Sequence, residues 1–136
     1  MTESALARKM KRKTGGRAAI IGAHAGYQTA SFAGMPRAGP SLTGTFDWIQ
    51  ILVRREVELR QLAPKAARAL KREGVLWISF PKGSSKIQTD LTRDKGWESL
   101  KNLDLKWVTL ISIDETWSAF ALRPYRAGEK RARAWS

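Results

Sequence analysis

Apolar residues gather in short runs along the chain, and three of these runs predict buried strands. Residues 17–21, 46–53 and 75–80 are nearly continuous apolar segments. Runs of this length without polar alternation are typical of strands that are covered on both faces of a sheet. We therefore predict three central strands, the first closed by a tight turn at Gly22 and the third ended by Pro81.

Between the second and third strands the apolar spacing changes to a helical period. Over residues 54–72 the apolar side chains fall on one face and most basic ones on the other. Pro64 either kinks this helix or starts its second half. Lys71 and Arg72 suit the negative end of the helix dipole, and we expect Gly74 to stop the helix in a left-handed conformation.

The chain after the third strand predicts a second helix and a closing hairpin. The helix covers residues 92–102, with Trp97 and Leu100 facing inward. Residues 106–113 and 116–122 are rich in β-forming residues and are separated by two acids, so they predict a hairpin at the edge of the sheet.

The stretch between the first two strands is ambiguous. Residues 23–33 suit a short helix, whereas the glycines and prolines of 34–44 predict loops with at most one short strand. Strands that alternate with helices imply a parallel sheet with right-handed crossovers. The predicted fold class is α/β: a single Rossmann-like domain with a mainly parallel sheet, a C-terminal antiparallel hairpin and helices on both faces.

Composition excludes several kinds of chemistry. The chain has 136 residues, no Cys and one His, which excludes disulfides, thiolate zinc sites and cysteine nucleophiles, and we expect no metal. No apolar run is long enough to span a membrane. A basic stretch before residues 18–25 imitates a signal peptide, but a buried strand explains it better, so we expect a cytoplasmic protein. Trp48, Trp77 and Trp107 lie within apolar runs and are expected in the core.

Positive charge is concentrated at the two ends of the chain. The formal net charge is +13, of which residues 1–17 hold +5 and residues 123–136 hold +4. We interpret residues 1–16 as a mobile basic extension, 17–123 as the domain and 124–136 as a mobile basic tail. The alternative is that these charges only aid solubility.

The charge leads to the first functional hypothesis, a non-catalytic protein that contacts nucleic acid or a ribonucleoprotein. The loop after the third strand suits phosphate, because Gly83 lets backbone N–H groups approach and its serines and lysines donate. It lacks the Walker A spacing, and a plain solvated loop is the alternative. The candidate phosphate contacts are Lys9, Lys11, Arg12, Lys13, Lys82, Ser84, Ser85, Lys86, Arg126, Lys130, Arg131 and Arg133.

Several segments resemble known families. Residues 46–78 look like the fourth strand, following helix and fifth strand of class I methyltransferase-like domains, and the closing hairpin is similar to that fold's last two strands. More narrowly, LWISFPK at 76–82, TDLT at 89–92 and DETWS at 114–118 resemble the signature of an uncharacterised bacterial group, the domain of unknown function 3052 family. The likeness covers about residues 17–123 and implies a fold, not an activity.

The methyltransferase resemblance implies a cofactor site that is incomplete here. That fold usually binds S-adenosylmethionine with a glycine-rich turn after the first strand and a ribose-binding acid after the second. The turn in this chain is Gly22-Ala-His-Ala-Gly26, with one glycine fewer, and no Asp or Glu occurs between Glu3 and Asp47. We therefore lean toward a protein that is not an enzyme and expect no cofactor.

Two alternatives stay open. The second hypothesis is an enzyme or sensor that keeps a nucleotide or S-adenosylmethionine pocket, lined by Gly22, His24, Gly26, Lys82 and Asp114. His24 and Asp114 are equally well explained as turn residues. The third hypothesis is a protein-interaction module that docks its basic tails on an acidic partner.

Overall fold

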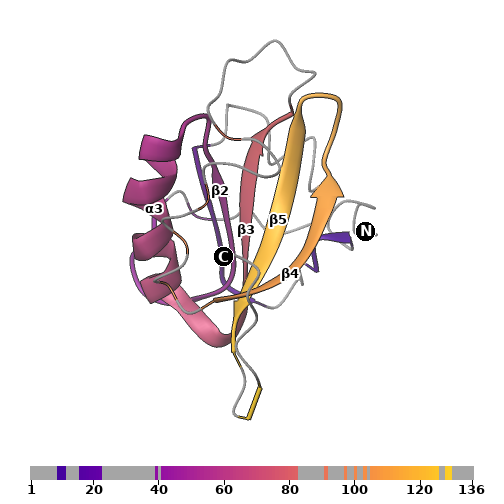
Figure 1. Ribbon diagram of the computed structural model, residues 1–136. Helices are drawn as coiled ribbons and strands as arrows, with labels where there is room; N and C mark the ends of the chain where they lie inside the picture. Colours follow the sequence, from indigo (N-terminus) through magenta and orange to yellow (C-terminus); the bar gives the residue numbers. More distant parts are fainter. Residues whose placement is uncertain are drawn as a thin grey trace, which may run out of the picture.

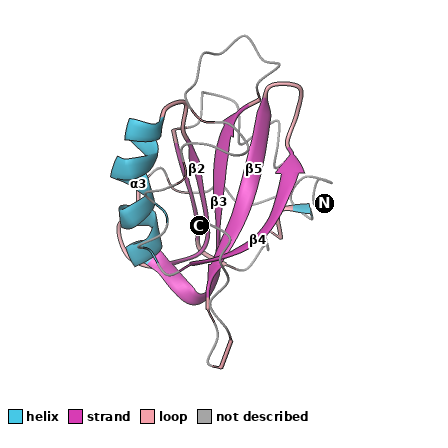
Figure 2. Ribbon diagram, viewed as in Figure 1, coloured by secondary structure: helices cyan, strands magenta, loops and turns pink. Residues whose placement is uncertain are grey.

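The computed structural model describes residues 9–11, 16–22, 39, 41–82, 91, 97, 100, 103, 105–125 and 128–129. In this part of the chain a five-stranded sheet carries a helix on one face (Figures 1 and 2). The elements are β1 (Ala18–Ile21), β2 (Phe46–Leu52), α3 (Glu56–Ala69), β3 (Leu70–Pro81), β4 (Leu105–Ser112) and β5 (Trp117–Pro124).

The sheet has the strand order β1-β2-β3-β5-β4. The strands β1, β2 and β3 are parallel, and β5 runs antiparallel between β3 and β4. These findings confirm the three apolar strands and the antiparallel hairpin, of which only β4 lies at the edge. Beside β1, Gly39 makes an isolated parallel bridge to Ala19, where we expected at most one short strand. Helices on both faces stay a prediction.

The predicted end of the first helix is wrong. The helix continues through Pro64 but ends at Ala69, and β3 begins at Leu70, so Lys71 and Arg72 belong to a strand. Leu70 is buried and pairs with Phe46, and this tertiary pairing outweighs the helical propensity of the next residues. Gly74 is not the expected left-handed stop.

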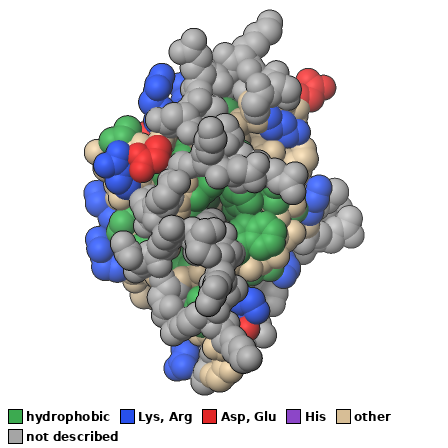
Figure 3. All heavy atoms as spheres, viewed as in Figure 1, with side chains coloured by type: hydrophobic (Ala, Val, Ile, Leu, Met, Phe, Trp, Pro, Cys, Tyr) green, Lys and Arg blue, Asp and Glu red, His purple; other side chains and the backbone are tan. Residues whose placement is uncertain are grey.

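Helix α3 begins where acidic side chains suit its dipole. The Glu58 carboxylate accepts the backbone N–H groups of Arg54 (2.9 Å) and Arg55 (3.0 Å), which satisfies donors that the helix leaves open. Lys and Arg side chains lie along the side of the molecule that α3 forms (Figure 3). Among the residues of α3, Lys65 and Arg68 are exposed. The outer face of α3 is therefore a solvated basic surface.

The face of the sheet that carries α3 holds the larger core. Leu59, on α3, packs into it fully buried with side chains of β2 and β3. Trp97 contacts Phe80 and Phe120 with ring centroids 5.0 and 4.9 Å apart. Trp97 and Leu100 are buried as predicted. No helix in the described ranges is long and apolar enough to cross a membrane.

The opposite face is covered in part by the N-terminal segment. The indole N–H groups of Trp48 and Trp77 both donate to the carbonyl oxygen of Met10, at 2.8 and 2.9 Å. Met10 is completely buried, whereas its neighbours Lys9 and Lys11 are exposed, so at Met10 the predicted N-terminal extension is anchored in the core. Trp48 and Trp77 lie in the core as predicted, whereas Trp107 is 36% exposed because β4 is the edge strand.

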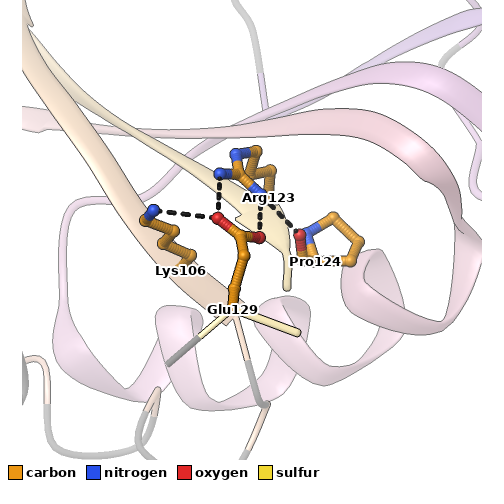
Figure 4. A network of polar contacts seen from close by, with 4 residues as sticks. All are labelled: Lys106, Arg123, Pro124 and Glu129. Atoms are coloured by element: carbon orange, nitrogen blue, oxygen red, sulfur yellow. Dashed lines mark hydrogen bonds and ion pairs between the residues drawn. The ribbon is translucent and has the colours of Figure 1, made fainter. Parts of the chain in front are cut away.

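The start of the predicted C-terminal tail also contacts the domain. The Glu129 carboxylate accepts hydrogen bonds from both terminal nitrogens of Arg123, at 2.8 and 2.7 Å. It also forms an ion pair with the Lys106 ammonium at 3.0 Å (Figure 4). This charge-assisted pairing raises the pKa of Arg123 above its ordinary value. Glu129 therefore joins the ends of β4 and β5 and pairs with Arg123, whose charge we counted with that of residues 123–136.

Candidate functional site

The carboxyl ends of β1, β2 and β3 lie at one edge of the sheet, where open α/β sheets bind ligands. Gly22 follows β1 directly and has a φ of 87°, in the left-handed region that favours glycine. A Cβ atom there would lie 2.6 Å from the backbone oxygen of Leu52, at the end of β2. This φ suits the predicted tight turn, and the close backbone approach leaves no room for a side chain.

Two lysines meet at the hairpin beside this edge. Lys82 follows β3, and its ammonium donates to the Ser112 hydroxyl at 2.6 Å. The Lys9 ammonium donates to the Ser112 carbonyl oxygen at 3.4 Å. Both lysines were predicted as phosphate contacts from separate parts of the sequence. The structure brings their positive charges to one residue, which no spacing along the chain indicates.

Asp114 is engaged in the hairpin turn. One of its carboxylate oxygens accepts the backbone N–H groups of Thr116 and Trp117, both at 2.8 Å. This geometry favours the turn interpretation of Asp114 over a role in a ligand pocket. In the ranges that the structure describes, no group of three or more His, Asp or Glu residues suits a metal ion.

Many predicted site residues are not placed. Gly22, Lys82 and Asp114 lie at the edge described above, and Lys9 reaches the same hairpin. Lys11 lies at a different place, described next. The predicted residues outside the described ranges are Arg12, Lys13, His24, Gly26, Ser84, Ser85, Lys86, Arg126, Lys130, Arg131 and Arg133.

A cleft of about 710 Å³ lies toward the amino ends of the parallel strands. Its lining includes the small side chains of Ala18 and Ala121. Charged side chains of Lys11, Arg17 and Lys71 also line it. No pattern in the sequence indicates this cleft, because residues far apart in the chain form it.

Asp47 is the central carboxylate of the cleft. It accepts the backbone N–H of Arg17 at 2.8 Å and the ammonium of Lys71 at 3.3 Å. The Arg17 hydrogen bond, with a smaller effect of Lys71, lowers the pKa of Asp47 below its ordinary value of 3.8 against the opposing effect of desolvation. Asp47 is therefore ionised at neutral pH.

This lowered pKa predicts a pH-dependent contribution to stability. A carboxylate with a folded-state pKa below the unfolded one stabilises the fold fully above the unfolded pKa and loses that effect as pH falls through the folded pKa. We expect Asp47→Asn to lower the free energy of unfolding at pH 7 by about 1 kcal/mol or less, because the side chain is half exposed. The difference from the original protein should shrink below pH 4. Urea unfolding at pH 7 and pH 3 measures it, with Glu115→Gln as control, and a pH-independent difference would contradict the assignment.

Comparisons with known proteins identify the fold. Three solved structures illustrate the likeness: ribosomal protein L11 methylase from Lactobacillus delbrueckii subsp. bulgaricus (14% identity, TM-score 0.58, covering 87% of this chain and 74% of that one), a DhpI-SAH complex (11%, 0.59, 88% and 82%), and magnesium protoporphyrin IX methyltransferase from Synechocystis PCC 6803 with bound SAH (10%, 0.58, 88% and 79%). The chain has a class I methyltransferase-like fold. At these identities the methyltransferase-like structures show the fold alone.

No family model and no curated protein matches the chain. The narrower resemblance to the domain of unknown function 3052 family therefore stays a prediction. The comparisons give the nucleic-acid hypothesis no support, and contacts with nucleic acid or an acidic protein partner are untested. The methyltransferase-like neighbours are consistent with the second hypothesis.

Proposed function

We propose that this methyltransferase-like domain binds a nucleotide or an S-adenosyl compound at the carboxyl edge of β1, β2 and β3. The observation that carries the proposal is the close approach at Gly22. The backbone of Gly22, after β1, lies so near the backbone oxygen of Leu52, at the end of β2, that no side chain fits there. A bare backbone at the end of the first strand lets a ligand approach closely. Two of the similar structures contain SAH, which supports an S-adenosyl compound as ligand.

The lysines at the hairpin supply charge for the anionic part of such a ligand. Lys82 and Lys9 both contact Ser112 at this side of the sheet. A phosphate or carboxylate there would accept charge-assisted hydrogen bonds from the two ammonium groups. This arrangement supports a ligand with an anionic end, a property shared by nucleotides and S-adenosyl compounds.

The residues fit an S-adenosyl compound only in part. The glycine turn suits it, but the chain has no Asp or Glu between Glu3 and Asp47, and Asp47 lies at the opposite end of β2. No carboxylate in the described ranges therefore replaces the acid that usually holds the ribose. We derive no methyl transfer from this site, and the proposed role is ligand binding by a sensor.

Thermal unfolding with added ligand tests the proposal. The probes are SAH, S-adenosylmethionine and ATP, each with the purified full chain. A ligand that binds only the folded state at one hundred times its Kd stabilises by about 2.7 kcal/mol, which raises the Tm by roughly 8–10 °C for a chain of this size. If none of the three probes shifts the Tm, the proposal is wrong.

A pair of lysine variants locates the binding. Lys82→Ala removes a charge at the proposed site and should weaken binding about tenfold, by loss of one charge-assisted contact. Lys65→Ala removes the same charge from the exposed face of α3 and should leave affinity unchanged. Equal effects of the two variants would mean that overall charge, not this edge, governs binding.

A further inference from the structure

Three local irregularities surround the cleft at the amino ends of the strands, and each places a cation. The first is a bulge in β3: Phe46 pairs with Leu70 and Trp48 pairs with Val75, so four residues of β3 stand opposite one of β2. Bulges reorient side chains next to functional sites. Here the bulge carries Lys71, whose ammonium contacts Asp47 at the cleft.

The second irregularity is the turn at Gly44, which lies against the guanidinium of Arg17. This guanidinium lies 4.5 Å from the centroid of the Phe46 ring and donates to the Thr43 carbonyl oxygen at 3.1 Å. Gly44 has a φ of 92°, and a Cβ atom there would lie 2.6 Å from a terminal nitrogen of Arg17. The turn at Gly44 thus leaves room for this guanidinium, which Phe46 and Thr43 hold at the margin of the cleft that Arg17 lines.

The third irregularity is the backbone of Lys11. Its φ is 60°, a left-handed conformation that side-chain-bearing residues rarely adopt. The preceding residue, Met10, is anchored in the core, and the turn at Lys11 takes the chain from there to the cleft. Non-glycine residues with positive φ occur often at ligand sites, where surrounding structure maintains them.

We propose that this cleft binds an anion carrying a phosphate group, held by the ammonium groups of Lys11 and Lys71, with Arg17 at the margin. Planar guanidinium and flexible ammonium groups together suit phosphate oxygens. Of the other charged residues that line the cleft, Arg123 is paired with Glu129. Asp47 and Glu73 keep the local charge low enough to favour a single phosphate over a polyphosphate.

The volume and floor of the cleft define the rest of the ligand. About 710 Å³ is within the usual range for small-molecule sites, and the apolar side chains in the lining suit an uncharged portion of the ligand. A phosphate monoester of a small molecule and one phosphodiester of a nucleic-acid strand share this chemistry. The site is distinct from the proposed carboxyl-edge site, because the 7 residues of β2 separate the two edges by roughly 20 Å.

Lys11→Gly is the most informative variant. Glycine adopts a positive φ without strain, so the substitution removes the charge and is expected to keep or raise the Tm. The matched control is Lys65→Ala, which removes one exposed charge from α3. The probes are a phosphate monoester, phenyl phosphate, and an unstructured single-stranded oligonucleotide, titrated by calorimetry in low salt.

We expect Lys11→Gly to weaken binding of at least one probe about tenfold and Lys65→Ala to change it less than twofold. Binding of phenyl phosphate identifies a small phosphorylated molecule as the ligand class, and binding of the oligonucleotide alone identifies a nucleic-acid strand. Equal effects of the two variants, or no binding of either probe to the original protein, would overturn the proposal. Lys82→Ala should leave binding here unchanged, which separates this result from the carboxyl-edge test.

Discussion

Replacing Gly22 by alanine is expected to lower the free energy of unfolding by about 2–4 kcal/mol. The alanine must adopt a φ of 87°, and its Cβ atom would lie 2.6 Å from the backbone oxygen of Leu52. Because that oxygen belongs to a paired strand, relief of the contact requires β1 and β2 to move apart. Urea unfolding followed by tryptophan fluorescence measures the loss.

Gly128 provides the control for this prediction. It also has a left-handed φ, 84°, but nothing lies within 4 Å of a Cβ atom built there. Gly128→Ala therefore carries only the conformational cost, about 1–2 kcal/mol at most. If both alanine variants lose the same stability, the close approach at the end of β1 does not exist as described.

Truncating Trp77 to alanine is expected to cost about 3–5 kcal/mol. Its side chain is fully buried, and its indole N–H is one of the two donors to the Met10 carbonyl oxygen. The variant therefore leaves a cavity and removes one of the two hydrogen bonds that hold Met10 on the sheet. Thermal and urea unfolding report the stability, and limited proteolysis reports whether the N-terminal segment becomes accessible.

Trp107→Ala is the matched control for Trp77. Trp107 is 36% exposed on the edge strand, so its removal should cost clearly less, about 1–2 kcal/mol. A larger loss of stability for Trp107→Ala than for Trp77→Ala would contradict the packing described for the face of the sheet opposite α3. Unchanged proteolysis of Trp77→Ala would show that Trp48 alone holds Met10.

The central strands were predictable because burial on both faces imposes an uninterrupted apolar run. The strands β2 and β3 have such runs. The edge strand β4 has a similar apolar pattern, and for this reason Trp107 was wrongly predicted to lie in the core. The end of α3 was not predictable from local pattern. Lys71, Arg72 and Gly74 have the composition of a helix terminus, but the pairing of Leu70 with Phe46 ends the helix earlier.

The sequence predicts the site residues at the carboxyl ends of the parallel strands better than those at the amino ends. Gly22 and Lys82 directly follow apolar strands, so their place at the carboxyl edge follows from the topology. The cleft at the other edge depends on contacts such as that between Arg17 and Asp47, thirty residues apart. No sequence spacing indicates that Arg17 and Asp47 meet. Met10 is recognised as an anchor only from the structure, where the indoles of Trp48 and Trp77 both donate to its carbonyl oxygen.

The proposed ligand, a nucleotide or S-adenosyl compound, would bind at the carboxyl edge of β1, β2 and β3. The most direct test is a titration of the isotope-labelled protein with SAH and ATP, followed residue by residue through backbone amide NMR shifts. We expect saturable shifts at Gly22, Val53 and Lys82 with at least one ligand. No shifts with either ligand, or shifts confined to Lys11, Arg17 and Lys71 at the opposite edge, would contradict it.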